Sequence, residues 1–227
     1  MLELRNITKR YRESAVFEGI DLKINNGSIV ELLGENGIGK STLLNIIGGM
    51  TRFEGDIWLN GISIRKNYKR YMENVSLVGN TPFLYEYLTP AETIDMVLSF
   101  LNLKSLDPSL EKLIEEIGLY KYKHMLTREL SLGTRQKLSL ILALLPSPDL
   151  ILLDEPFVNL DVESREAVLR YLKKYISENN AILIYATHST EAYLKGFPDK
   201  KIRLKREELD GKVVLECDCD EIEIKDI

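Results

Sequence analysis

The sequence has few cysteines and lacks a long apolar run. Its two cysteines, Cys217 and Cys219, both lie near the carboxyl end of the 227-residue chain. Two cysteines separated by one residue can bind a soft metal or act in redox chemistry, but structural zinc sites need a larger ligand set. The longest apolar candidate, residues 138–145, is far shorter than the roughly 20 residues that cross a bilayer. We therefore expect no membrane-spanning helix, and the cysteine pair alone is weak support for a metal site.

Basic charge and a targeting segment are also missing. The net charge of −5 at pH 7 argues against nucleic-acid binding through a broad basic face, so no nucleic-acid partner is expected. The first residues, Met1–Arg5, do not have the basic and then apolar pattern of a signal peptide, which predicts a cytoplasmic protein. With 44% hydrophobic and 29% charged residues, the composition is that of an ordinary globular protein.

A glycine-rich motif lies between a predicted strand, residues 28–33, and a helical pattern that begins at residue 43. Glycines let backbone N–H groups turn toward a phosphate, the helix N-terminus adds a partial positive charge, and Lys40 adds a full one. The hydroxyl of Ser41 is placed to bind Mg²⁺. The motif has the Walker A pattern and predicts binding of a nucleoside triphosphate. The residues expected to bind it are Gly34, Glu35, Asn36, Gly37, Ile38, Gly39, Lys40, Ser41 and Thr42.

Two carboxylates follow another apolar run, residues 149–153, which is typical of a strand buried on both faces. Asp154 and Glu155 would stand at the carboxyl edge of the sheet, where ligands bind in open α/β sheets. Asp154 is suited to hold Mg²⁺, and Glu155 to polarise an attacking water. The pair on its own is also compatible with a solvated strand end. The phosphate-binding motif upstream favours the catalytic interpretation.

The order of strands and helices predicts the fold class. Residues 2–7 and 19–24 and a hairpin at 55–64 indicate antiparallel strands outside the main sheet, while strands at 149–154 and 181–186 alternate with helices and indicate a parallel sheet. Residues 89 to about 130 have helical spacing and predict an inserted helical subdomain. We therefore predict an α/β protein: a P-loop NTPase core with a mostly parallel sheet, an N-terminal antiparallel β subdomain and an inserted α-helical subdomain.

Five features in this order resemble the ATP-binding cassette (ABC) family, the nucleotide-binding subunits of ABC transporters. They are the motif at residues 34–42, Ser131 with Gly133, Asp154-Glu155-Pro156, Asn159-Leu160-Asp161 and His188. The resemblance implies an ABC ATPase domain over residues 1–204, followed by a short acidic tail, residues 205–227, that we expect to form a β hairpin. It also implies a head-to-tail dimer, in which the phosphate loop of one copy and the Ser131–Gly133 segment of the other enclose one ATP.

The resemblance also implies roles for single residues. Tyr11 matches the family's aromatic residue that stacks on adenine, and Val16 would pack beside the ribose. His188 matches the switch histidine that contacts the γ-phosphate and holds Glu155 and water in line. Asp161 corresponds to the aspartate of the loop that crosses the dimer interface. The expected catalytic residues are Lys40, Glu155 and His188, and the expected magnesium ligands are Ser41, Asp154 and Asn80.

Two departures from the family pattern stand out. Asn80 occupies the place of a glutamine, which predicts a weaker or water-mediated contact with Mg²⁺, unless the alignment is shifted there. In the signature, Leu132 replaces a glycine and Thr134 a glutamine, whereas Ser131 and Gly133 are retained. We expect catalysis to survive, because the retained residues are those that would meet the phosphate.

The resulting hypothesis is an ATPase subunit that powers transport through a separate membrane protein. Its expected partners are ATP, Mg²⁺, a transmembrane permease subunit and a second ATPase subunit, which is either an identical or a related chain. The protein would be peripheral on the cytoplasmic face of the cell membrane, docked through residues 83–89 and the helical insertion. The lack of a long regulatory domain after the cassette favours export.

Two other interpretations stay open at this point. A soluble ABC ATPase acting on ribosomes or DNA is one, but such relatives generally carry two cassettes in one chain or a long coiled-coil insertion. The other is a small-molecule phosphotransferase, which leaves Ser131, Gly133 and His188 unexplained.

Overall fold

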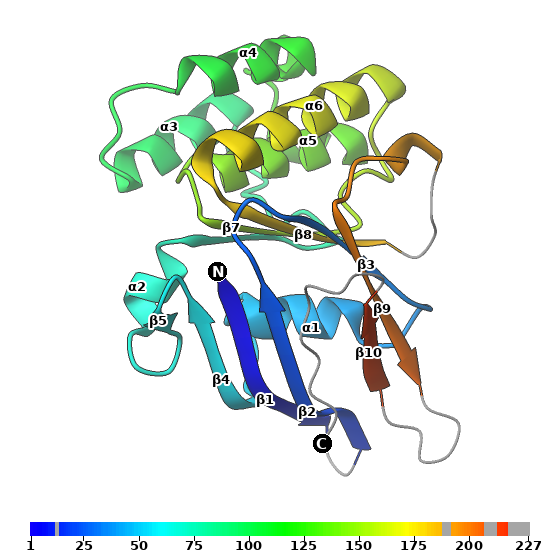
Figure 1. Ribbon diagram of the computed structural model, residues 1–227. Coiled ribbons are helices and arrows are strands. Elements are labelled where there is room, and N and C mark those ends of the chain that lie inside the picture. Colours follow the sequence, from blue (N-terminus) through cyan, green and yellow to red (C-terminus); the bar gives the residue numbers. More distant parts are fainter. Residues whose placement is uncertain (12–13, 188–191, 207–212, 218–227) are drawn as a thin grey trace.

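The computed structural model describes residues 1–11, 14–187, 192–206 and 213–217. Figure 1 shows helices α3 to α6 on one side of the central sheet, and helix α1 with a second, antiparallel sheet on the other side. The layers therefore agree with the predicted class, a P-loop type α/β core with an added antiparallel β unit and added helices.

The antiparallel sheet has the strand order β2-β1-β4-β5. Its strands are β1 (Leu2–Tyr11), β2 (Ser14–Ile24), β4 (Glu54–Leu59) and β5 (Ile62–Ser63). The first two strands are longer than the predicted spans 2–7 and 19–24. Residues 9–11 form a polar stretch outside the predicted strands, but Lys9 and Phe17 are partners in the ladder and both are buried. Burial of a lysine is invisible to a polar-apolar pattern.

The central sheet has the order β10-β9-β3-β8-β7-β6. Strands β9, β3, β8, β7 and β6 are parallel, and only β10 pairs antiparallel, with β9. Strands β3, β7 and β8 are buried at every position. The spans are β3 (Ile29–Leu33), β6 (Val75–Val78), β7 (Leu150–Asp154), β8 (Ile182–Thr187), β9 (Lys200–Arg206) and β10 (Val213–Cys217).

Most helices begin at a capping signal that is readable in the sequence. Thr89 and Glu92 form a capping box at the start of α3, and Asp107 and Asp161 accept backbone N–H groups at the starts of α4 and α6. The helices are α1 (Lys40–Ile47), α2 (Tyr68–Met72), α3 (Pro90–Phe100), α4 (Pro108–Glu116), α5 (Leu132–Leu144) and α6 (Val162–Asn179). The described residues also form the short 3₁₀ helices η1 (Leu119–Tyr122), η2 (Thr127–Glu129) and η3 (Ala192–Leu194).

The core has two parts, one on each face of the central sheet. Alternate residues of β7 divide between them: Leu150 and Leu152 pack toward α1 and the antiparallel sheet, whereas Ile151 and Leu153 pack toward the helices of the other layer. This alternation follows from strand geometry. Ile38 of the phosphate loop and the buried residues of α1 pack into the first of these two parts.

The carboxyl end of the chain adds strands to the central sheet. The expected tail boundary after residue 204 falls inside β9, and β10 pairs with β9 as a hairpin. Residues 207–212 and 218–227, with Cys219, lie outside the described residues. Among the residues that the structure describes, no helix combines the length and apolar character needed to cross a bilayer.

A buried polar row crosses three strands of the central sheet. Glu31 on β3 lies in register with both Tyr185 on β8 and Lys201 on β9. Its carboxylate is fully buried and makes an ion pair with the Lys201 ammonium at 3.1 Å, although the atoms do not meet hydrogen-bond geometry. Burial, and next to it the Glu31 charge, raises the pKa of Tyr185 well above its usual range. Lys201 is thus the group that balances a carboxylate inside the sheet.

This balance predicts the effect of Lys201→Met on stability. Removing the cation leaves a buried carboxylate without its partner, so the free energy of unfolding in urea should fall by about 1–3 kcal/mol. The double variant Glu31→Met/Lys201→Met should return close to the wild-type value, because the charge is then gone altogether. Lys69→Met, on the exposed α2, is the control for loss of one positive charge. An unchanged stability for Lys201→Met alone would contradict the assignment.

Candidate nucleotide-binding site

The phosphate loop is curled around a buried ammonium. Lys40 is the first residue of α1 and is only 6% exposed. Its Nζ donates hydrogen bonds to the carbonyl oxygens of Gly34, at 2.7 Å, and Glu35, at 3.0 Å. The loop therefore closes on the lysine that carries the positive charge of the site.

Gly39 is the glycine that this shape requires. It precedes α1 with φ +119°, a conformation that side-chain-bearing residues rarely adopt. A Cβ at this position would lie 2.8 Å from the ring of Phe17 and 3.0 Å from Val16. The loop thus packs directly against β2, and Val16, the residue expected beside the ribose, touches the phosphate loop.

Two carboxylates stand close to this ammonium. Asp154 ends β7, is buried, and accepts a hydrogen bond from the hydroxyl of Ser41. Burial raises the pKa of Asp154 and the Glu155 charge adds to the rise, while Ser41 and Lys40 oppose it. Burial likewise lowers the pKa of Lys40, against the attraction of Glu155 and Asp154. Lys40, Ser41, Asp154 and Glu155 therefore form one electrostatic unit.

This unit suits a hard cation. The hydroxyl of Ser41 and the carboxylate of Asp154 are oxygen ligands of the kind that Mg²⁺ prefers, and a cation bound there would favour the charged form of the buried carboxylate. Glu155 follows with φ +50°, an uncommon conformation for a residue with a side chain. Its backbone N–H donates to the carbonyl oxygen of Ala186 at 3.1 Å, which anchors this bend to β8.

A second group of predicted residues gathers at the N-terminal ends of α5 and α6. Ser131 caps α5, and its Oγ accepts the backbone N–H of Thr134 at 3.1 Å. A Cβ on Gly133 would lie 2.4 Å from the carbonyl oxygen of Asn159, so glycine is needed there for close packing. Asp161 accepts a hydrogen bond from Lys137 at 2.6 Å.

The acidity of Asp161 reflects this setting. Partial burial alone would raise the pKa of its carboxyl, but the hydrogen bonds from Lys137 and from Ser164 outweigh it and hold the pKa well below the usual range. Asp161 is therefore ionised at neutral pH and tied to α5. Neither the contact of Gly133 with Asn159 nor the ion pair with Lys137 was foreseen from the sequence, because each joins segments that are distant along the chain.

The family model described as ABC transporter matches residues 17–158. The tyrosine transport ATP-binding protein of Clostridioides difficile is 34% identical over 95% of this chain and 91% of its own length. The chain belongs to the ABC transporter ATP-binding family.

Two further relatives extend the comparison of this ABC cassette. The phosphonates import ATP-binding protein PhnC of Treponema denticola is 30% identical over 95% of this chain and 89% of its own length. The dimeric cassette MJ0796, solved in a post-hydrolysis state with ADP and Pi, has a TM-score of 0.79 and 26% identity over 95% of this chain and 98% of that one. Other relatives are longer, and the chain spans 62% and 61% of two of them.

Family membership identifies the cassette as an ATP-binding ATPase. The match at residues 17–158 includes the phosphate loop, Ser131, Gly133 and the carboxylates that end β7, and it does not reach Asp161 or His188.

Other predicted residues of the cassette lie at neighbouring strand ends. Asn80 is exposed and follows β6, which pairs with β7, so it emerges at the same sheet edge as Asp154. Tyr11 ends β1 and is 53% exposed. His188 lies outside the described residues, and β8, which precedes it, runs beside both β3 and β7. The roles of these residues stay predictions.

The contact between Gly133 and Asn159 predicts the result of Gly133→Ala. Replacing glycine with alanine normally stabilises a helix. Here, however, the new methyl group would clash with the backbone carbonyl oxygen of Asn159, which has little freedom to move. The free energy of unfolding, measured without nucleotide, should fall by about 1–3 kcal/mol. Leu132→Ala, at the exposed neighbouring position, should change it by less than about 0.5 kcal/mol. A Gly133→Ala protein as stable as wild type would refute the packing role.

Proposed function

We propose that the cassette hydrolyses ATP to drive transport through a separate transmembrane permease, as one of two ATPase subunits on the cytoplasmic face of the membrane. The observation that carries this proposal is the cluster of Lys40, Ser41, Asp154 and Glu155, in which Lys40 and Asp154 are buried. It combines a phosphate-binding ammonium, oxygen ligands for Mg²⁺ and a second carboxylate beside them. Binding ATP without hydrolysis would not need that second carboxylate.

The residues divide the chemistry as follows. Backbone N–H groups of residues 34–42 and the Lys40 ammonium bind the β- and γ-phosphates, where negative charge develops during transfer. Ser41 and Asp154 hold Mg²⁺ directly or through water, with Asn80 at the same sheet edge. Mg²⁺, when bound, would neutralise phosphate charge. Glu155 accepts a proton from the attacking water, and His188 keeps that water in line.

The second half of the site comes from another ATPase subunit in this proposal. Ser131 and the first turn of α5 offer backbone N–H groups that have no partner within the helix. A γ-phosphate bound to the phosphate loop of one copy is a suitable acceptor for these donors of the other copy. Loss of the γ-phosphate on hydrolysis removes that bridge and opens the pair.

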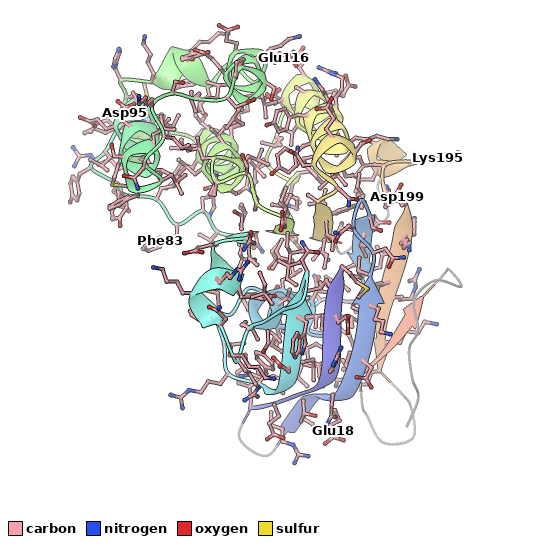
Figure 2. The ribbon with its side chains drawn as sticks, turned by 60° about the vertical axis from the view of Figure 1, so that its left-hand side comes forward. Glu18, Phe83, Asp95, Glu116, Lys195 and Asp199 are labelled. Carbon is pink, nitrogen blue, oxygen red and sulfur yellow. The ribbon has the colours of Figure 1, made fainter. Side chains whose placement is uncertain are left out.

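A surface groove supports the docking of a membrane partner. The groove has a volume of about 410 Å³ and lies beside the end of β6 and the middle of α5. At its rim, Phe83 is 92% exposed and Met50 is also exposed, which is unusual for large apolar side chains. In Figure 2, Phe83 projects from the left side of the molecule, below the helical layer and above the antiparallel sheet. A partner helix with an apolar face fits such a groove.

The neighbouring segment is held to the helical insertion. Thr127 donates from its backbone N–H and its hydroxyl to the carbonyl oxygen of Leu88, and Arg128 N–H donates to Glu86. In this proposal, a partner bound in the groove would act on both the insertion and the end of β6, which is followed by Asn80. The direction of transport stays a prediction: export is our expectation from the sequence, whereas PhnC is named for import.

The role of Glu155 is tested by Glu155→Gln. The amide keeps the size of the side chain but cannot accept the proton, so turnover should fall about 100-fold or more while ATP binding is kept. Size-exclusion chromatography with ATP should then show a trapped dimer. Glu166→Gln, on the exposed face of α6, is the control. Wild-type turnover in Glu155→Gln would exclude Glu155 as the base.

The docking surface is tested by Phe83→Glu. A charge at the groove should abolish transport in the assembled complex, because burying a carboxylate against an apolar helix is unfavourable. The ATPase activity of the isolated cassette should stay within about twofold of wild type, since surface changes away from a site have small effects. Tyr68→Glu places the same charge on α2, outside the groove and the helical insertion, and should transport normally. Normal transport by Phe83→Glu would refute this surface. Purification with ribosomes or DNA in place of a membrane protein would favour the non-transport alternative.

A further inference from the structure

Lys9 is a buried lysine beside the exposed ring of Tyr11. It is 7% exposed, whereas Tyr11, two residues later on β1, is 53% exposed. Residues two apart on a strand leave the same face, so the two side chains meet. The Lys9 ammonium lies 4.5 Å from the centroid of the Tyr11 ring. The ring therefore rests against a cation while much of its surface faces solvent.

The same ammonium is fixed to the segment that follows the phosphate-loop helix. Its Nζ donates to the hydroxyl of Thr51 at 2.9 Å and to the carbonyl oxygen of Arg52 at 2.7 Å. Both acceptors come shortly after α1 ends. The start of α1 also touches this ladder, because Phe17, the partner of Lys9 on β2, contacts Gly39. Strand β1 is thus tied to the segment after α1 through Lys9, and its partner strand β2 packs against the start of α1 through Phe17. These contacts fix the position of the Tyr11 ring relative to the phosphate loop.

Burial of an ammonium is unfavourable unless polar groups surround it. Here the hydroxyl oxygen of Thr51, the carbonyl oxygen of Arg52 and the face of the Tyr11 ring take the place of water around the Lys9 ammonium. The ring face attracts the ammonium because it carries partial negative charge. The arrangement also restrains the ring. A tyrosine at a strand end would otherwise change rotamer freely, and a ring restrained before binding loses less entropy when a base stacks on it.

We propose that Lys9 is a positioning residue for the nucleotide base: it holds the Tyr11 ring at a fixed place relative to the phosphate loop, so that the purine stacks on the ring while the phosphates reach Lys40. The inference rests on the proposed ATP-binding function and on the prediction from the sequence that the Tyr11 ring stacks on adenine. Lys9 does not touch the phosphates in this scheme. Its removal should weaken recognition of the base and leave recognition of the phosphates unchanged.

Calorimetry on the full chain separates these effects. Two ligands are titrated, each in the presence of Mg²⁺: ATP, and inorganic tripolyphosphate, which lacks the base. Lys9→Gln keeps an amide donor for the Arg52 carbonyl but removes the cation. It should lower the affinity for ATP about 3- to 10-fold and leave that for tripolyphosphate unchanged. Tyr11→Ala should lower ATP affinity about 5- to 100-fold. The double variant should be no weaker than Tyr11→Ala, because Lys9 acts through the ring.

The controls decide between positioning and a structural role. Lys9→Arg restores a cation and should bind ATP more tightly than Lys9→Gln. Arg10→Gln removes a charge on the opposite, exposed face of β1 and should bind both ligands as wild type does. The inference is overturned if Lys9→Gln binds ATP normally, loses both ligands equally or fails to fold. Normal ATP binding by Tyr11→Ala would instead refute the stacking that the proposed function assumes.

Discussion

The buried ammonium of Lys40 is the interaction on which the site depends. A cation that is almost fully removed from water needs oxygen atoms around it, and the carbonyl groups of Gly34 and Glu35 supply them. This requirement curls the loop into the shape that a polyphosphate needs before any ligand arrives. The carboxylates of Asp154 and Glu155 balance the charge across the sheet edge. A preorganised loop of this kind loses little in reorganisation when phosphates bind.

The order of strands in the central sheet determines which side chains lie close to the Lys40 ammonium. Strand β8 lies between β3, which leads into the phosphate loop, and β7, which ends at Asp154. Because all three are parallel, the groups that follow β3 and β7 emerge at one edge of the sheet. The polar row of Glu31, Tyr185 and Lys201 lies in β3, β8 and β9 and adds a charge constraint to an otherwise apolar core.

Structural features that depend on residues close together in the chain could be predicted from the sequence. The strand, glycine-rich loop and helix around Lys40, the capping box of Thr89 and the cap at Asp161 all depend on neighbours a few residues away. The strand alternation gave the fold class for the same reason. The reach of β1 to Tyr11 was missed, since a lysine in the pattern suggests solvent and Lys9 is buried. Its burial depends on Thr51 and Arg52, which the local pattern does not contain.

The sequence predicted the residues of the candidate site, but not that they form two ordered groups, one around Lys40 and one at the starts of α5 and α6. Gly133 seemed important only for contact with phosphate, whereas its close approach to Asn159 makes it part of the packing that joins the starts of α5 and α6. Ser131 is similarly engaged with Thr134, and Asp161 with Lys137. Each group is therefore ordered within one chain. In a head-to-tail pair, ATP would join two preformed surfaces, so little ordering would oppose closure and the γ-phosphate contacts would decide its stability.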